Sequence, residues 1–361
     1  MECIWLSPLF PKRGCVLLGV LSPELYQFPI ESILRTGRGN TSRMTLVPGA
    51  MLPSDVDKLI KGVIPVAEVE NRSLGDGNPI TVAHSIMTDP PELLGYLAAN
   101  LPVAMAWSRW AKPVSMTVNL LFPLGTEEFL VRRILISLGK EMKRIGITAS
   151  GVSISSLAGI STSIADVTVL GSGQKTQGQK LTKGDVIVIA GRPLAELALR
   201  CSHDRPDLVE AVGGNPKYLR SAYTKISAVE AAMFLFREGS KSIALMGDGG
   251  VVKAAKRISR EAKGGLMFDV EKIQWDEVGL KIVQALDGDP SSATSYGSLI
   301  AILDKNEAEE KMRSLTEQKI VVSAAGKVTG GVGVWKSSGG PMTQHKDVYS
   351  LISPTRSSLL L

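Results

Sequence analysis

The sequence predicts a two-domain protein of the α+β or α/β class, and three observations lead to this prediction. The chain has 361 residues, more than one ordinary hydrophobic core holds. Strand-like and helix-like apolar patterns occur in both halves. A polar, glycine-rich stretch at 171–184 lies between two apolar strand patterns. We therefore expect domains at residues 1–172 and 173–335, followed by a flexible tail at 336–361.

The first half is expected to supply two helices and the strands around them. Asp89, two prolines and Glu92 mark the start of a helix over residues 91–105, because proline and acidic side chains suit a first helical turn. A second helix has Thr126 as its candidate N-cap and Gly146 as its end. Apolar or alternating runs predict strands at 80–87, 114–122, 149–155 and 163–170.

The second half repeats this mixture. An uninterrupted apolar run at 186–190 predicts a buried strand. The segment from Ile243 predicts a short strand, a glycine turn at 247–250 and a helix to about residue 262. Further strands are expected at 266–270, 298–303 and 319–328, and further helices at 193–200, 228–236 and 307–316.

Composition excludes several classes of protein. With 44% hydrophobic and 21% charged residues, the chain can form packed cores, which argues against a largely disordered protein. Its three cysteines, with no Cys-x-x-Cys pair, argue against a disulfide framework or a zinc knuckle and favour the cytoplasm. The longest apolar tract, 93–107, is shorter than the roughly 20 residues of a membrane helix, so no membrane association is expected.

The net charge of +6 is modest for this length. It is compatible with an anionic ligand, an acidic partner or RNA and does not select among them.

The order of several motifs is more informative than any one of them. The chain contains, in sequence, PGAMLPSDVD, VAHSIMTDP, AMAWSRWAKP, MTVNLLFP, LTKGDVIVIAG and LMGDGGVVKAAKRIS. This series resembles the aminoimidazole ribonucleotide (AIR) synthetase superfamily over about residues 20–332. Among its branches, the chain looks closest to the hydrogenase-maturation carbamoyl dehydratase type and its AIR synthase-related relatives.

The resemblance implies two α+β domains in each subunit of a homodimer, whose N-domain sheets join into a barrel. It also implies an ATP site near the N-domain and the subunit interface, where acidic side chains hold magnesium. In such a site an oxygen atom of the substrate is phosphorylated, and Mg²⁺ neutralises the phosphate charge.

This chain departs from the acidic pattern that the resemblance implies. Asp55 keeps one acidic position, which makes it the candidate metal ligand, but three others fall on Ser85, Met105 and Ser153. Serine and methionine cannot neutralise a metal triphosphate. Two nearby acids, Asp57 and Asp89, could compensate through a shift of register. In the C-domain, the turn Gly247-Asp248-Gly249-Gly250 keeps an acid and paired glycines.

The carbamoyl dehydratase branch carries its substrate on a C-terminal cysteine. No cysteine follows Cys201 in this sequence. Full membership of that enzyme type is therefore not expected.

Two further segments could bind an anion. Arg35, Arg38 and Arg43 stand among small residues and could wrap phosphate oxygens, or they could form an ordinary exposed basic loop. Gly249 and Gly250 open a helix whose free N–H groups could receive an anion, or they simply make a tight turn.

A basic stripe and one histidine complete the candidates. The helix after the glycine turn places four cations at spacings of three and four residues: Lys253, Lys256, Arg257 and Arg260. The stripe is either a solvated surface or a docking site for RNA or an acidic partner protein. His84 lies on a strand and is either an interior histidine or a catalyst.

Three functional hypotheses follow. The first is a homodimeric accessory or ligand-binding protein whose metal–ATP chemistry is weakened. The second is a working ATP-dependent enzyme that phosphorylates a carbonyl, amide or phosphate oxygen, with its magnesium site rebuilt from Asp55, Asp57, Asp89 and Asp248. The third is association with RNA or the ribosome. Nucleic acid is the less expected partner. A nucleotide, another small anion or a protein is expected instead.

Overall fold

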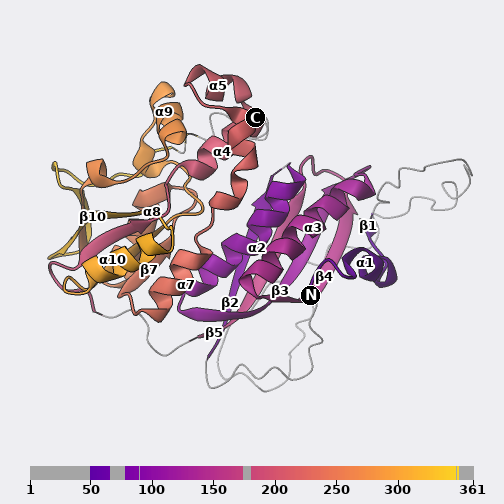
Figure 1. Ribbon diagram of the computed structural model, residues 1–361, viewed down its shortest axis with the longest axis horizontal. Helices are drawn as coiled ribbons and strands as arrows, with labels where there is room; N and C mark the ends of the chain where they lie inside the picture. The colour runs from indigo at the N-terminus through magenta and orange to yellow at the C-terminus, as the bar shows by residue number, and fades with distance from the viewer. Residues whose placement is uncertain (1–48, 66–77, 89, 174–179, 347, 349–361) are drawn as a thin grey trace, which may run out of the picture. The chain divides into compact units, whose positions relative to one another are not determined.

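The computed structural model describes residues 49–65, 78–88, 90–173, 180–346 and 348, which belong to one unit of the chain, residues 44–361 (Figure 1). They form two sheets and ten α-helices, so the α+β class is confirmed. In this described part, no helix combines the length and the apolar character that a bilayer crossing requires.

The first sheet has the strand order β1-β4-β3-β5-β2. Its strands β3 and β4 are parallel and are connected through a helix, whereas the other neighbours are antiparallel. The strands are β1 (Gly49–Ala50), β2 (Asn78–Met87), β3 (Ala111–Pro123), β4 (Thr148–Leu157) and β5 (Ile164–Gly173), and the helices are α1 (Pro53–Ile60), α2 (Pro91–Ser108) and α3 (Glu128–Ile145).

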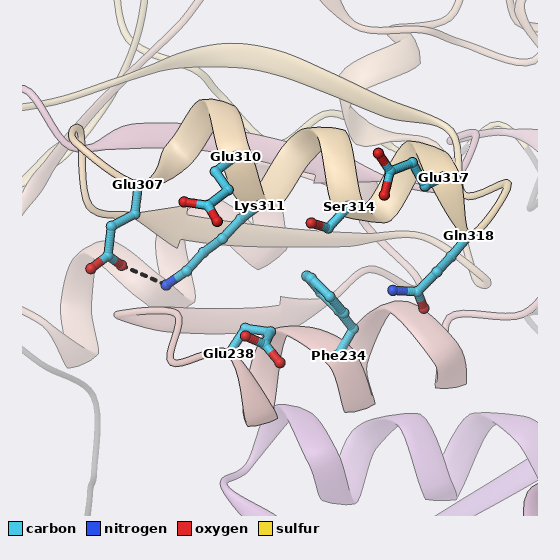
Figure 2. Close-up of a pocket in the computed structure, with 8 residues that line it drawn as sticks. All are labelled: Phe234, Glu238, Glu307, Glu310, Lys311, Ser314, Glu317 and Gln318. Carbon is cyan, nitrogen blue, oxygen red and sulfur yellow. Dashed lines mark hydrogen bonds and ion pairs between the residues drawn. The ribbon is translucent and has the colours of Figure 1, made fainter.

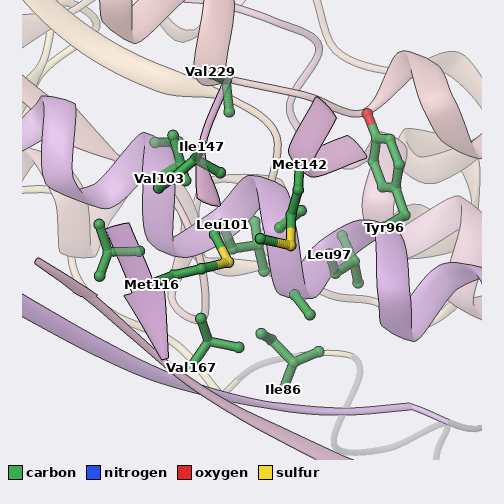
Figure 3. Packing of buried hydrophobic residues seen from close by; sticks show 14 of the residues in the cluster. Ile86, Tyr96, Leu97, Leu101, Val103, Met116, Met142, Ile147, Val167 and Val229 are labelled. Atoms are coloured by element: carbon green, nitrogen blue, oxygen red, sulfur yellow. The ribbon is translucent and has the colours of Figure 1, made fainter. Parts of the chain in front are cut away.

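Alternation along the strands gives this sheet two different faces. In β5, Ala165, Val167 and Val169 are fully buried, whereas Asp166 and Thr168 are only half-buried. The buried face packs against α2 and α3, which lie together on that side of the sheet in Figure 1. Figure 3 shows the resulting core, in which side chains from both helices and the strands meet.

The second sheet has the order β11-β8-β10-β6-β9-β7 and is antiparallel apart from the β11–β8 pair. Its strands are β6 (Val186–Ala190), β7 (Ser242–Leu245), β8 (Gly265–Phe268), β9 (Leu299–Leu303), β10 (Val322–Thr329) and β11 (Gly333–Lys336). The surrounding helices are α4 (Ala195–Asp204), α5 (Pro206–Ala211), α6 (Pro216–Ser221), α7 (Val229–Arg237), α8 (Gly250–Glu261), α9 (Glu277–Ala285) and α10 (Ala308–Glu317). Strand β9 is buried at all five positions.

Most expected elements of the described chain are confirmed, but the start of α3 is not where the sequence placed it. The helix begins at Glu128 with Glu127 as its N-cap residue. The Thr126 hydroxyl instead donates a hydrogen bond to the Pro123 carbonyl, 2.8 Å away, and so closes the preceding turn. Gly146 ends the helix in the left-handed conformation, as expected.

Part of the segment assigned to the tail is packed against the second half. The Ser337 N–H donates to the Phe268 carbonyl at 2.7 Å, and the Met342 N–H donates to the Val334 carbonyl at 2.9 Å. Met342 and Val348 are both buried. These residues therefore belong to the packed structure of the second half.

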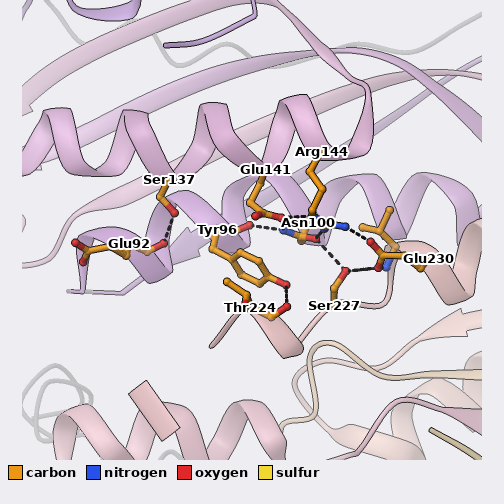
Figure 4. Close-up of polar contacts among 10 residues, drawn as sticks. Glu92, Tyr96, Asn100, Ser137, Glu141, Arg144, Thr224, Ser227 and Glu230 are labelled. Carbon is orange, nitrogen blue, oxygen red and sulfur yellow. Dashed lines mark hydrogen bonds and ion pairs between the residues drawn. The ribbon is translucent and has the colours of Figure 1, made fainter. Parts of the chain in front are cut away.

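A polar network joins α2 and α3 to the segment that leads into α7 (Figure 4). The Arg144 guanidinium contacts Glu141 of its own helix and Glu230 of α7. It also donates to the Asn100 amide oxygen, 2.9 Å away, and the Ser227 hydroxyl lies 3.0 Å from that same oxygen. Because Glu141 is buried, this arginine supplies the opposite charge that the carboxylate needs in the interior.

Candidate functional site

A line of four polar side chains crosses four of the five strands of the first sheet, from β2 at one edge to β4. The register pairs Ser85 of β2 with Asp166 of β5, Asp166 with Asn119 of β3, and Asn119 with Ser153 of β4. The Ser85 hydroxyl donates to Asp166 Oδ1 at 2.7 Å, and the Ser153 hydroxyl donates to Asn119 Oδ1 at 2.7 Å. We call these four residues the polar row.

The polar row lies on the face of the sheet opposite α2 and α3. Ser85 and Ser153 are exposed, and Asp166 and Asn119 are half-buried between their neighbouring strands. On the same face of β2, Met87 is 53% exposed. A ligand or a second polypeptide can therefore reach the row directly.

The structure places two of the three positions where the sequence lacks an expected acid in one row, on the same face of the sheet. Ser85 and Ser153 stand at the two ends of the polar row. Met105 does not join them, because it lies on α2 and packs against the core on the other side of the sheet.

Asp166 was not among the residues that the sequence singled out. It carries the one carboxylate of the polar row, directly opposite Ser85. The signal was the polar residue in an alternating strand, Ile164-Ala-Asp-Val, but only the pairing of β5 with β2 and β3 shows what it faces.

The acids at the start of α1 are placed on the surface. Asp55 forms an ion pair of 3.0 Å with Lys58, and the side chains are 43% and 76% exposed. Asp57 is exposed as well. An exposed ion pair of this kind adds little to the free energy of unfolding, so it does little to fix the position of the Asp55 carboxylate.

The glycine turn after β7 has a steric reason for its composition. Gly250 has a φ of 52°, and a Cβ atom there would lie 2.4 Å from the Ala293 carbonyl oxygen. Gly249, with a φ of 84°, also occupies the left-handed region. These two steric constraints support the interpretation of the segment as a tight turn. The side chain of Asp248, in the same turn, is exposed.

A second polar group, the edge cluster, surrounds His84 where β2 meets the second half of the chain. It comprises His84, Glu196, Arg200, Asp248 and Tyr296. The His84 and Tyr296 rings are 5.6 Å apart, centroid to centroid. Glu196 is fully buried, pairs with Arg200 and accepts a hydrogen bond of 2.9 Å from the Thr294 hydroxyl.

Burial is the main cause that lowers the pKa of His84 below 6.5, and the positive charge of Arg200 adds to it. Asp248 and Asp166 act in the opposite direction without reversing the shift. His84 is therefore neutral at physiological pH, held against an aromatic ring, which fits an interior histidine better than a proton donor.

His84 should make the stability of the fold depend on pH. Because its pKa is lower in the folded chain, the unfolded chain binds the extra proton first; stability is retained above about pH 6.5 and falls as the pH decreases toward the folded value. We expect His84→Gln to reduce the slope of the free energy of unfolding against pH below about pH 6.5, by no more than the binding of about one proton accounts for. Urea unfolding between pH 5 and 8 measures the slope, with His345→Gln, at an exposed histidine, as the control. Equal slopes for wild type and His84→Gln would contradict the assignment.

A groove elsewhere on the described chain is large enough for a nucleotide but carries the wrong charge. A groove of about 690 Å³ lies between α7 and α10 (Figure 2). Its lining includes four glutamates and one lysine, Lys311, which is paired with Glu307 at 2.7 Å. A phosphate group would meet net negative charge there.

Magnesium does not fit the described residues by themselves. Among them, no three histidine, cysteine or acidic side chains are grouped closely enough to hold a metal ion. The polar row offers a single carboxylate, and Asp55, Asp57 and Asp248 do not form a carboxylate cluster with it. Asp89 and the arginines Arg35, Arg38 and Arg43 lie outside the described residues.

The buried cysteine is chemically quiet. Burial, together with nearby Asp204 and Glu196, raises the pKa of the Cys201 thiol to about 12. It is therefore protonated at neutral pH and does not serve as a nucleophile.

Comparison with known proteins identifies the fold. No protein-family model matches the sequence, and no curated protein matches it. Solved structures do match. Escherichia coli HypE, a hydrogenase maturation protein, has a TM-score of 0.62 and 15% identity, over 81% of this chain and 96% of that one. A structure of HypE in complex with ATP has a TM-score of 0.63 and 14% identity, over 81% of this chain and 92% of that one. Thiamine-monophosphate kinase from Stenotrophomonas maltophilia has a TM-score of 0.62 and 14% identity, over 80% of this chain and 95% of that one.

At these identities the likeness shows the fold. The chain has the fold of HypE and of thiamine-monophosphate kinase, and the likeness to the hydrogenase-maturation type that the sequence motifs indicate is confirmed at the level of the fold.

Proposed function

We propose that this chain is an AIR synthetase-like protein with weakened magnesium–nucleotide chemistry, which acts as a ligand-binding or accessory factor. The observation that carries the proposal is the composition of the polar row. Two of its four members are the serines Ser85 and Ser153, at positions where the family resemblance expects acids, and its single carboxylate, Asp166, accepts a hydrogen bond from Ser85.

The charge balance of phosphoryl transfer supports the proposal. Transfer of a γ-phosphoryl group depends on Mg²⁺ to neutralise the phosphates, and Mg²⁺ depends on carboxylate oxygens to remain in place. A serine hydroxyl can accept or donate a hydrogen bond, but it carries no charge at neutral pH. With one carboxylate in the row, a metal triphosphate would be held weakly.

The proposal includes a nucleotide as the ligand and a homodimer as the assembly, both at the exposed face that carries the polar row. One of the matching HypE structures is an ATP complex, which makes a nucleotide the first small anion to examine. A homodimer joined through this face is part of the proposal, because the face combines the polar row with exposed Met87 and half-buried Leu121 and Ile164. The three cysteines suit a reducing cytoplasm.

A working enzyme is the second candidate, and Asp166 is the observation that favours it. Its carboxylate faces the position where an acid is missing and could replace that acid in a rearranged site. Such an enzyme would phosphorylate a carbonyl, amide or phosphate oxygen. Magnesium-dependent release of phosphate or ADP from ATP, abolished in Asp166→Asn, would establish it over the accessory role.

Adding the missing carboxylates tests the proposal. We expect the double variant Ser85→Asp, Ser153→Asp to bind ATP at least about tenfold more tightly with Mg²⁺ than without it, whereas wild type lacks this dependence. Isothermal titration measures it, and Thr81→Asp, on the same face of β2, is the control. Sedimentation of the same samples reports whether the chain is a dimer. If the double variant gains no magnesium dependence, the polar row is not the metal position.

A further inference from the structure

The structure divides the basic stripe of α8 into two parts. Lys253, Lys256 and Arg260 are exposed, whereas Arg257 is half-buried and donates to the Ile243 carbonyl at 3.2 Å. Burial lowers the pKa of Arg257, and nearby Arg109 adds to this effect. Arg257 thus supports the packing of α8, and the other three cations form the surface.

Two of these cations line a groove between α8 and β11. The groove has a volume of about 360 Å³, and Lys256 and Arg260 form one wall. Its floor is apolar and includes Val334 and Met342, both buried, and its opposite wall carries Val332, which is 60% exposed. Val332 therefore extends the apolar lining of the groove out to the solvent.

The walls of the groove are fixed by hydrogen bonds. The Met342 N–H donates to the Val334 carbonyl at 2.9 Å, and the Gly333 N–H donates to the Ser259 hydroxyl at 2.9 Å. Trp335 also lines the groove and forms an isolated bridge with Pro341. The shape is therefore present before anything binds, which lowers the entropy lost on association.

The charges of the groove point to an acidic partner. The described lining contains no aspartate or glutamate. Lys256 and Arg260 form no ion pair with any side chain that the structure describes, so their charges remain available to a partner. They are four residues apart on α8, a spacing that places both on one side of the helix.

We infer that this groove docks an acidic peptide segment of a partner protein, with an apolar side chain on the floor and carboxylates on Lys256 and Arg260. A buried apolar centre with aromatic and methionine side chains and a charged rim is the usual composition of a protein interface. RNA would also be attracted to the cations, but an apolar floor gives a phosphate backbone nothing to contact.

Selection from a displayed library of random 12-residue peptides, against the full chain, tests the inference. We expect the selected peptides to carry at least two acidic residues beside a bulky apolar one. Their affinity, measured by fluorescence anisotropy, should fall about tenfold or more in Lys256→Glu, Arg260→Glu and be unchanged in Lys140→Glu, Lys217→Glu, which reverses two exposed cations elsewhere.

Three results would overturn the inference. Selected peptides without acidic residues would exclude charge recognition, and equal binding to the Lys256→Glu, Arg260→Glu variant would place the peptides elsewhere. Displacement of the peptide by a 12-nucleotide single-stranded RNA, bound through the same two cations with a steep salt dependence, would make the groove an RNA site. None of these measurements uses the polar row, so their failure is distinct from failure of the proposed function.

Discussion

Replacing Lys241 with methionine is expected to lower the free energy of unfolding by about 3–5 kcal/mol. The Lys241 ammonium lies 2.8 Å from Asp185 Oδ1 and 2.8 Å from Asp304 Oδ2. Its side chain is 8% exposed and that of Asp185 is 1% exposed, so the variant would leave a carboxylate buried without its cation. Breaking a buried pair in this way is among the most destabilising single changes.

The ion triad also joins three strands of the second sheet. Asp185 immediately precedes β6, Lys241 immediately precedes β7, and Asp304 immediately follows β9. Urea unfolding measures the loss, with Lys281→Met as the control, because Lys281 forms an exposed pair with Glu277 and should contribute less than about 1 kcal/mol. A loss in Lys241→Met no larger than in the control would show that the triad does not hold the sheet together.

Replacing Gly95 with alanine is expected to destabilise the first half by about 1–3 kcal/mol, although alanine is the better helix former. Gly95 lies in α2 where the helix crosses α3. A Cβ atom there would be 2.3 Å from the Ile134 carbonyl oxygen and 2.8 Å from the Leu138 nitrogen, so backbone would have to move.

The control for this crossing is Gly330→Ala. A Cβ atom at Gly330 would have nothing within 4 Å, and the residue has no positive φ. Thermal unfolding should show a lower midpoint for Gly95→Ala and little change for the control. If Gly95→Ala were as stable as wild type, the two helices would not pack as closely as the structure places them.

The sequence predicted the regular elements best where one local signal sufficed. The alternation of β2 and the glycine at the end of α3 are examples. Helix α1 was missed although its signals were present, with proline in the first turn and Val56, Leu59 and Ile60 buried at helical spacing. The helices α5 and α6 have six residues each, too few for a periodic pattern to show.

The site depended on information that a sequence pattern does not contain. That Ser85 and Ser153 lie in one row follows from strand order and register, and the same pairing brings in Asp166. Met105 was grouped with them by motif alone, and the structure separates it because α2 covers the other face of the sheet. Arg257 likewise had the right spacing for the basic stripe but is turned inward.

The magnesium dependence of nucleotide binding tests the central claim most directly. Isothermal titration of the wild-type chain with a non-hydrolysable imido analogue of ATP, in EDTA and in excess Mg²⁺, measures it. The polar row, with one carboxylate, predicts affinities that agree within about threefold in the two conditions, or no binding in either. Binding that tightens about tenfold or more with Mg²⁺ would contradict the account and indicate an intact metal–nucleotide site.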